Sequence, residues 1–111
     1  MSGWYELSKS DNGQYRFKLV AGNGEPILSS EQYTTLAAAK NGIESVQKNC
    51  LDAARFSKET ATNGKAYFNL KAANHQIIGT SQMYASEASR DNGIESVMKN
   101  GGTDKIKDLT A

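Results

Sequence analysis

Five residues in two matching stretches of the chain are the first candidates for binding chemistry. In QYRFKLVA (14–21) and KAYFNLKAA (65–73), apolar residues recur at every second position, which predicts a strand with one buried face. The opposite face then presents Arg16, Lys18, Tyr67, Asn69 and Lys71. Several RNA-binding modules use basic and aromatic groups on a sheet face to hold phosphates and stack bases. The alternative is an ordinary solvated face, which the net charge of only +1 favours.

A second candidate is a pair of hydroxyl residues that occurs twice, Ser30 with Tyr33 and Ser81 with Tyr84. Each pair falls between a short predicted strand and a predicted helix. A ligand pocket at this junction would occur in both halves and would take two ligands per chain. The structural alternative is a tyrosine that packs its ring and hydrogen-bonds its hydroxyl locally.

The remaining reactive side chains form no catalytic or metal-binding pattern. The single histidine, His75, falls in a predicted turn, and the single cysteine, Cys50, falls at a predicted helix end. Neither has carboxylates at metal-ligand spacing, and the sequence lacks nucleophile-elbow, Walker and dinucleotide fingerprints. Glu44 and Glu95 each precede a lysine by four residues, the spacing of a solvated helix ion pair. We therefore expect no catalytic residues, no metal and no cofactor, in a protein that is not an enzyme.

Composition and charge are those of a small globular protein. Of the 111 residues, 38% are hydrophobic and 23% are charged, as in a small globular domain. No apolar run approaches the roughly 20 residues that span a bilayer, and the start MSGWYELSKS lacks the features of a signal peptide. One cysteine allows no internal disulfide. We expect a single domain over 1–111, in the cytoplasm and not at a membrane.

The chain is two copies of one unit. A shift of 51 residues aligns it with itself without a gap, so that NGIESV occurs at 41–46 and again at 92–97. The copies span about 1–50 and 52–101, and a tail covers 102–111. Because a unit of about 50 residues is marginal alone, we expect the two to share one core about a pseudo-twofold axis. The chain would then be a monomer with internal symmetry.

Each copy predicts three strands followed by a helix, and hence an α+β fold of two tandem β-β-β-α repeats with an antiparallel sheet packed on two helices. The predicted strands are 4–10, 14–21 and 25–30 in the first copy, and 55–60, 65–73 and 76–81 in the second. A helix follows Thr35 and Ser86, which are hydroxyl residues suited to capping it. The tail has the weak alternation of a last edge strand.

The turn at Asp11-Asn12-Gly13 allows two registers. A two-residue turn would place Leu19 opposite Glu6, whereas a three-residue loop with a left-handed Gly13 would place Leu19 opposite Tyr5. A slip of one residue moves a whole strand's side chains to the other face, so the facing pattern predicts the three-residue loop. In the next turn of each repeat, the matched Asn23 and Asn74 are the residues expected at positive φ.

A turn dipeptide, Asn-Gly, lies inside each predicted helix at 41–42 and 92–93. Glycine costs about 1 kcal/mol relative to alanine in a helix interior, which suggests a compensating gain. Other small residues continue the stripe on the same helix face, Ala38 and Ser45 among them. We expect these faces to pack closely on each other or on the sheet; the alternative is a helix break at Asn41-Gly42.

The tandem layout, with NGKAYFNLKAANHQIIGTSQMYAS and NGIESV, resembles the YegP-like family of small bacterial proteins over nearly the whole chain. The resemblance implies three-strand-plus-helix units whose post-helix strands are exchanged between the halves. It implies no activity. We expect an interaction module for an unknown macromolecular partner; the alternatives are nucleic-acid binding through the basic sheet face and small-ligand binding at two equivalent pockets.

Truncation of the chain after residue 51 tests the shared core. The isolated first copy is expected to unfold or to dimerise, because it has too little apolar surface of its own to bury. Circular dichroism and analytical ultracentrifugation would measure both outcomes. A stable, monomeric half would contradict the shared core.

Overall fold

The computed structural model describes residues 3–110 and confirms the α+β class with two β-β-β-α repeats. The first repeat holds β1 (Trp4–Lys9), β2 (Tyr15–Val20), β3 (Pro26–Ser29) and α1 (Leu36–Asn49). After a short 3-10 helix, η1 (Ala53–Arg55), the second holds β4 (Phe56–Thr60), β5 (Ala66–Lys71), β6 (Ile77–Thr80) and α2 (Glu87–Asn100). The tail ends in β7 (Ile106–Asp108), the predicted last edge strand.

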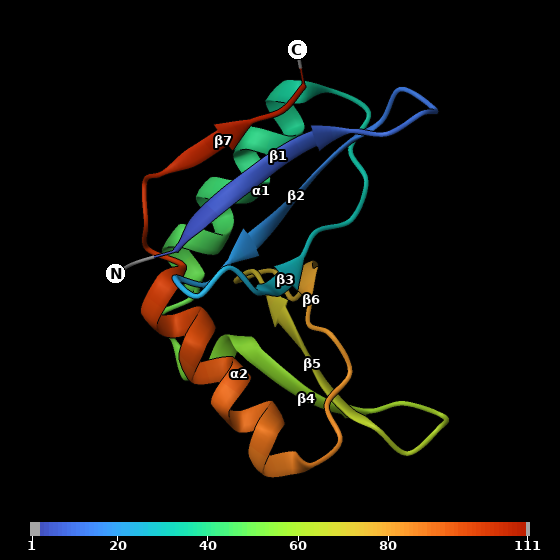
Figure 1. Cartoon of the computed structure of the whole chain (residues 1–111), viewed down its shortest axis with the longest axis vertical. Coiled ribbons are helices and arrows are strands. Elements are labelled where there is room, and N and C mark those ends of the chain that lie inside the picture. The colour runs from blue at the N-terminus through green and yellow to red at the C-terminus, as the bar shows by residue number, and fades with distance from the viewer. Residues whose placement is uncertain (1–2, 111) are drawn as a thin grey trace.

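All seven strands form one sheet in the order β4-β5-β6-β3-β2-β1-β7. The repeats meet where Ser29 of β3 pairs with Thr80 of β6. These two residues are equivalent in the repeat, so the pseudo-twofold axis passes between them. Figure 1 shows β1, β2 and α1 in the upper half of the molecule and β4, β5 and α2 in the lower half, with β3 and β6 between them.

The hairpins have the predicted three-residue loops. Leu19 lies opposite Tyr5, and in the second repeat Leu70 lies opposite Phe56. Gly13 and the equivalent Gly64 both have φ of 83°, a left-handed conformation that glycine adopts without steric cost. The observed register therefore confirms that the facing pattern, and not the Asn-Gly dipeptide alone, sets the turn.

The prediction for the next turn was wrong by one residue. Positive φ falls on Gly24 (88°) and His75 (69°), and not on Asn23 and Asn74. The amide oxygen of Asn23 instead accepts a hydrogen bond from the backbone N–H two residues later at 3.1 Å, and Asn74 makes the equivalent bond. Asparagine thus holds each turn through its side chain, as an Asx turn, while the next residue takes the left-handed backbone.

The strand that follows each helix joins the other half, which confirms the exchange that the resemblance implied. After α1 the chain enters the second repeat as β4 and pairs with β5. After α2 it returns to the first repeat, where β7 runs parallel to β1 with Ile106 opposite Tyr5. The N–H of Tyr5 donates to Lys105 O at 2.9 Å, and the N–H of Leu109 donates to Leu7 O at 2.7 Å.

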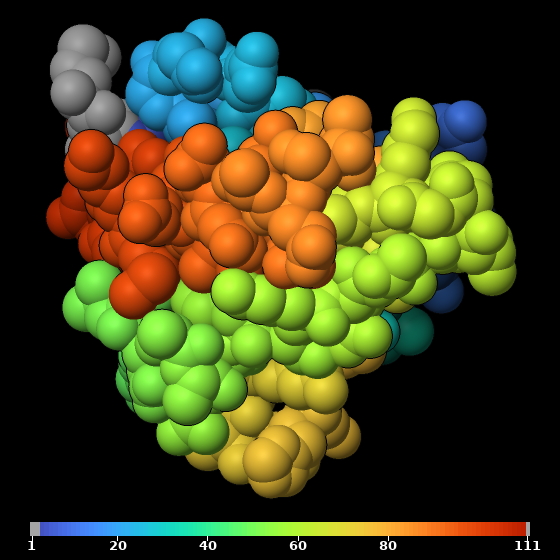
Figure 2. All heavy atoms as spheres, turned by 90° about the horizontal axis from the view of Figure 1, so that it is seen from below, coloured from blue at the N-terminus to red at the C-terminus, as the bar shows by residue number. Residues whose placement is uncertain are grey.

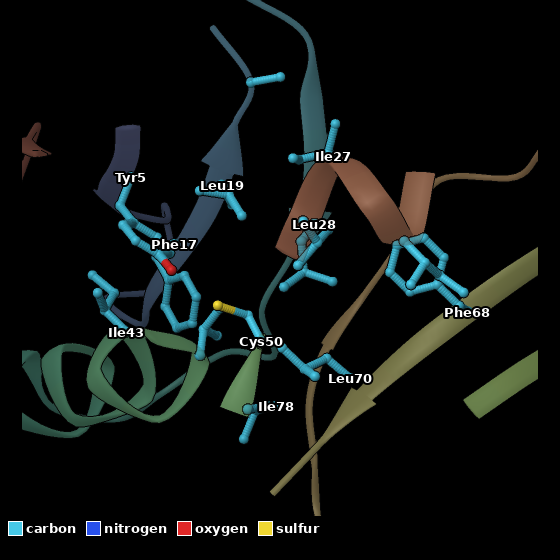
Figure 3. Packing of buried hydrophobic residues seen from close by; sticks show 14 of the residues in the cluster. Tyr5, Phe17, Leu19, Ile27, Leu28, Ile43, Cys50, Phe68, Leu70 and Ile78 are labelled. Atoms are coloured by element: carbon cyan, nitrogen blue, oxygen red, sulfur yellow. The ribbon is translucent and has the colours of Figure 1, made fainter. Parts of the chain in front are cut away.

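One hydrophobic cluster contains buried side chains from both repeats. Figure 3 shows Phe17 from β2 and Leu70 from β5 on either side of Cys50, which is fully buried. Each helix contacts strands of both repeats, α1 with β2, β5 and β6, and α2 with β2, β3 and β5. The core is therefore built from both repeats together.

Both helices begin at the predicted caps. The hydroxyl of Thr35 accepts the N–H of Ala38 at 3.1 Å, and the hydroxyl of Ser86 accepts the N–H of Ser89 at 3.1 Å. The helices continue through both Asn-Gly dipeptides, so the alternative of a helix break is wrong.

The helix glycines make room for a tyrosine ring. Tyr33 stacks on Phe17, with 6.2 Å between ring centroids. A Cβ added at Gly42 would lie 2.5 Å from the Tyr33 hydroxyl oxygen and 2.8 Å from the Phe17 ring. Gly93 has the same relation to the ring of Tyr84. The close approach is therefore made by aromatic side chains from the sheet side, and not by the opposite helix.

Replacing Gly42 or Gly93 with leucine is expected to lower the free energy of unfolding by about 1–3 kcal/mol, because the new side chain displaces a stacked tyrosine. Urea denaturation would measure it. Gly102→Leu is the matched control, since nothing lies within 4 Å of a Cβ at Gly102. If Gly42→Leu and Gly93→Leu were as stable as wild type, the ring-accommodation account would fail.

Burial raises the pKa of the Cys50 thiol, and the thiolate is the reactive form. The native protein is therefore expected to react with a disulfide reagent such as Ellman's reagent far more slowly than the same protein in 6 M guanidinium. Equal rates in the two solutions would show that Cys50 is accessible and ionised in the folded state.

Candidate functional site

The face of the sheet opposite the helices carries the predicted binding residues. Phe17 and Leu19 of β2 point into the core, so Arg16 and Lys18 point to the other side, because side chains alternate along a strand. The same alternation in β5 places Tyr67, Asn69 and Lys71 there. We call this side the open face.

A row of directly opposed residues crosses the open face and continues through the pseudo-twofold axis. The strand registers give it in the order Lys107, Glu6, Lys18, Ser29, Thr80, Asn69 and Ser57. In the first repeat the row holds an ion pair, with Lys18 Nζ 3.8 Å from Glu6 Oε1. In the second repeat the hydroxyl of Thr80 donates to Asn69 Oδ1 at 2.9 Å. The row is charged in one half and neutral in the other.

The structure divides the five predicted residues of the open face into two groups. Arg16 and Lys18 are exposed neighbours on β2, whereas Tyr67, Asn69 and Lys71 lie on β5. Strands β3 and β6 separate the groups, which corresponds to about 14 Å at the usual strand spacing. Asn69 is only 8% exposed, and its carbonyl oxygen is already hydrogen-bonded, so it contributes little accessible surface.

A pocket of about 180 Å³ lies beside Arg16 and Lys18 on the open face. Its other lining residues are Ser8, Phe17, Ser29 and Ser30. Among residues 3–110, Lys18 has its ion pair with Glu6, while no carboxylate forms an ion pair with Arg16. The pocket therefore combines a guanidinium with no ion pair in that range, a partly paired ammonium and the hydroxyls of Ser8 and Ser29, which is the chemistry of an anion site. The third hydroxyl, that of Ser30, already donates to Glu31 O.

The Ser30/Tyr33 and Ser81/Tyr84 junctions have the same structure in both repeats. The hydroxyl of Ser30 accepts the Phe17 N–H at 2.9 Å and donates to Glu31 O at 2.7 Å. Ser81 makes the equivalent bonds at 3.0 and 2.8 Å. Each serine thus completes backbone hydrogen bonding where its strand ends.

The tyrosine of each junction lies apart from its serine. Tyr33 packs its ring on the core side of Phe17, under Gly42, whereas Ser30 lines the pocket on the open face. Burial, and secondarily the Glu31 carboxylate, raises the pKa of the Tyr33 hydroxyl. The structure therefore does not bring the serine and tyrosine hydroxyls together, and a ligand at these junctions stays a prediction.

Two residues of the open face, Trp4 and Lys107, were not predicted from the sequence. Trp4 lies opposite Val20, and the Lys107 ammonium sits 4.5 Å from the centre of the Trp4 ring. The indole N–H donates to Glu6 at 3.0 Å. The alternation of Tyr5 and Leu7 could have placed Trp4 on this face, but no local signal could have brought Lys107 to it.

At the opposite end of the sheet, none of the described strands pairs with the outer edge of β4. Figure 2 shows α2 (orange) directly against the segment that contains β4 (yellow-green). Lys58 Nζ lies 3.2 Å from Asp91 Oδ1 across this contact, and Lys58 and Arg90 hold the pKa of Asp91 below its usual range. In the first repeat, the position equivalent to Lys58 is the fully buried Leu7.

Neither a metal cluster nor a membrane span is present in the part of the chain that the structure describes. No three His, Cys, Asp or Glu side chains of residues 3–110 gather as metal ligands. No helix in the same range is long and apolar enough to cross a membrane.

Known sequences and structures match the chain over almost its whole length. The family model described as "Domain of unknown function (DUF1508)" matches twice, over residues 10–56 and 61–108. A UPF0339 protein of Acinetobacter baylyi is 66% identical over 110 residues, which is 99% of each chain.

Two solution NMR structures have the same fold. A UPF0339 protein from Shewanella oneidensis is 70% identical, with a TM-score of 0.93 over 99% of this chain and 93% of that one. The protein yegP from Escherichia coli, described as of unknown function, is 58% identical, with a TM-score of 0.95 over 100% of this chain and 96% of that one.

Proposed function

The chain belongs to the UPF0339 family, the YegP-like proteins with two DUF1508 repeats, and on that premise we propose that it is a non-enzymatic interaction module. Its open face binds an anionic macromolecule, and single-stranded nucleic acid is the partner that fits this face best. The observation that carries the proposal is the Arg16 guanidinium, which forms no ion pair among residues 3–110 and is exposed beside Lys18 at the pocket.

The positive charge of the chain is concentrated on the open face. Among the strand residues that the structure describes, four cations lie on it, Arg16, Lys18, Lys71 and Lys107, against two carboxylates, Glu6 and Glu59. The face therefore carries a net charge of +2, although the whole chain carries only +1. A local excess of this kind attracts phosphates even when the protein is nearly neutral overall.

Aromatic rings lie toward both ends of the same face. Trp4 on β1 and Tyr67 on β5 are both half-buried, so part of each side chain remains accessible. Four strand intervals separate β1 from β5, or about 19 Å at the usual spacing. Cations between separated rings suit an extended polymer with phosphates and stacking bases better than they suit one compact small molecule.

Titration of 15N-labelled protein with a short single-stranded RNA and DNA tests the proposal. Amide shifts are expected on β1, β2 and β5, and the affinity should fall steeply between low and high salt, because phosphate contacts release counterions. Arg16→Gln should weaken binding. Lys48→Gln is the matched control, since it removes the same charge from an exposed position on α1.

A poly-glutamate peptide of equal charge tests the other class of anionic partner. Equal binding of peptide and oligonucleotide would replace the nucleic-acid proposal with a protein partner. Absence of shifts on the three strands with every ligand would remove the open face as the interaction surface.

A further inference from the structure

We infer that the first repeat, and not the second, holds one phosphate-sized oxyanion site on the open face, at the pocket lined by Ser8, Arg16, Lys18 and Ser29. The inference deepens the proposed function and rests on it for the identity of the ligand. The occupant is a backbone phosphate of single-stranded nucleic acid.

The strand register places donors of two kinds around one point. Arg16 and Lys18 are two residues apart on β2, so both side chains rise on the same face about 7 Å apart. Ser8 of β1 lies opposite Arg16, and Ser29 of β3 lies opposite Lys18. A tetrahedral oxyanion in the pocket would thus meet a cation and a hydroxyl from each cross-strand pair.

The two outer hydroxyls are free to bind a ligand. Among the hydrogen bonds of residues 3–110, none involves the side chain of Ser8 or Ser29. The hydroxyl of Ser30, in contrast, is committed on both sides, to Phe17 N–H and to Glu31 O. Ser30 therefore shapes the pocket wall, and Ser8 and Ser29 act as donors to the anion.

The pocket has a net positive charge, because two cations, Arg16 and Lys18, stand against one carboxylate, Glu6. Lys18 Nζ lies 3.8 Å from Glu6 Oε1, and this ion pair partly neutralises the charge of Lys18. Arg16 forms no ion pair with a carboxylate of residues 3–110, and its planar guanidinium can give two parallel hydrogen bonds to a phosphate.

The second repeat has no cation at the positions equivalent to Arg16 and Lys18. The residues equivalent to Ser8, Arg16 and Lys18 are Glu59, Tyr67 and Asn69. A carboxylate thus stands where the first repeat has a hydroxyl, and no cation stands opposite it. Thr80, the equivalent of Ser29, has its hydroxyl bonded to Asn69. The fold repeats, but the anion site does not.

A single site on a pseudosymmetric sheet gives the bound strand a direction. The phosphate would lie over β2, while the half-buried ring of Tyr67, at the position equivalent to Arg16, offers a base-stacking surface on β5. The two ends of the open face therefore make different contacts with a nucleic acid strand.

Titration of the full-length, 15N-labelled chain with inorganic phosphate, and separately with a single-stranded oligonucleotide, tests the inference. Phosphate is expected to shift the amides at Ser8, Arg16–Lys18 and Ser29 with a stoichiometry of one, and to leave Glu59 and Tyr67–Asn69 unshifted. Arg16→Gln should weaken oligonucleotide binding about tenfold, the usual effect of losing a charge-assisted hydrogen bond. Arg16→Lys should recover part of the affinity, and Lys48→Gln should behave as wild type.

A gain-of-site variant makes the comparison of the repeats decisive. Replacing Glu59→Ser, Tyr67→Arg and Asn69→Lys together should create a second set of phosphate shifts, on β4 and β5. Unfolding of this variant would be visible in its spectrum and would leave the Arg16 series as the deciding test. Phosphate shifts of equal size in both repeats of the wild type would overturn the inference.

Different results would contradict the oxyanion site and the binding of nucleic acid by the open face. If the oligonucleotide binds the open face but Arg16→Gln binds it equally well, the oxyanion site is wrong and the interaction surface stands. If phosphate binds at the pocket but the oligonucleotide binds no more tightly than phosphate, nucleic-acid binding is wrong, and the pocket is a site for a free anion.

Discussion

Two units of about 50 residues bury their apolar side chains in one shared cluster, and the rest of the structure is arranged around it. Each helix lies across strands of both repeats, and each post-helix strand enters the other half. The hydroxyl of Tyr5 donates to Gly101 O at 2.6 Å, which ties the first strand to the end of the last helix. Because a unit of this size leaves much of its apolar surface exposed when alone, these crossings are what make the core sufficient.

On the core face of the sheet, the two repeats keep apolar residues at equivalent positions. At the strand edges and on the open face, equivalent positions carry different residues. In the first repeat β7 covers the edge of β1, and Leu7 is fully buried. In the second repeat no strand within residues 3–110 pairs with the outer edge of β4, and Lys58 of this strand forms an ion pair with Asp91. A charge at an open strand edge discourages pairing with other chains. The repeats also differ on the open face, where Arg16 and Lys18 of the first repeat correspond to Tyr67 and Asn69 of the second.

Those parts of the structure that depend on local pattern could be predicted from the sequence. Alternation in β2 and β5 assigned the faces, and the pairing of Leu19 with Tyr5 followed from the need to bury both. Thr35 and Ser86 marked the helix starts because their hydroxyls cap free N–H groups. The positive φ at Gly24 and His75 was missed because asparagine can support a turn either through its own backbone or through its side chain.

Contacts between distant segments could not be predicted in this way. The partner of Gly42 is a tyrosine ring nine residues earlier, and its position depends on stacking against β2. The predicted face residues were named from β2 and β5, but the pocket is built from β1, β2 and β3 together. Lys107 reaches Trp4 only because the tail returns across the molecule.

The pairing of β1 with β7 also sets the order of events during synthesis. The outer edge of β1 bonds to residues 105–109, which are synthesised long after it. Domains generally fold as their segments emerge, but this edge stays unpaired until residues 105–109 have been made. Nascent chains stalled before residue 105 would therefore expose the outer edge of β1.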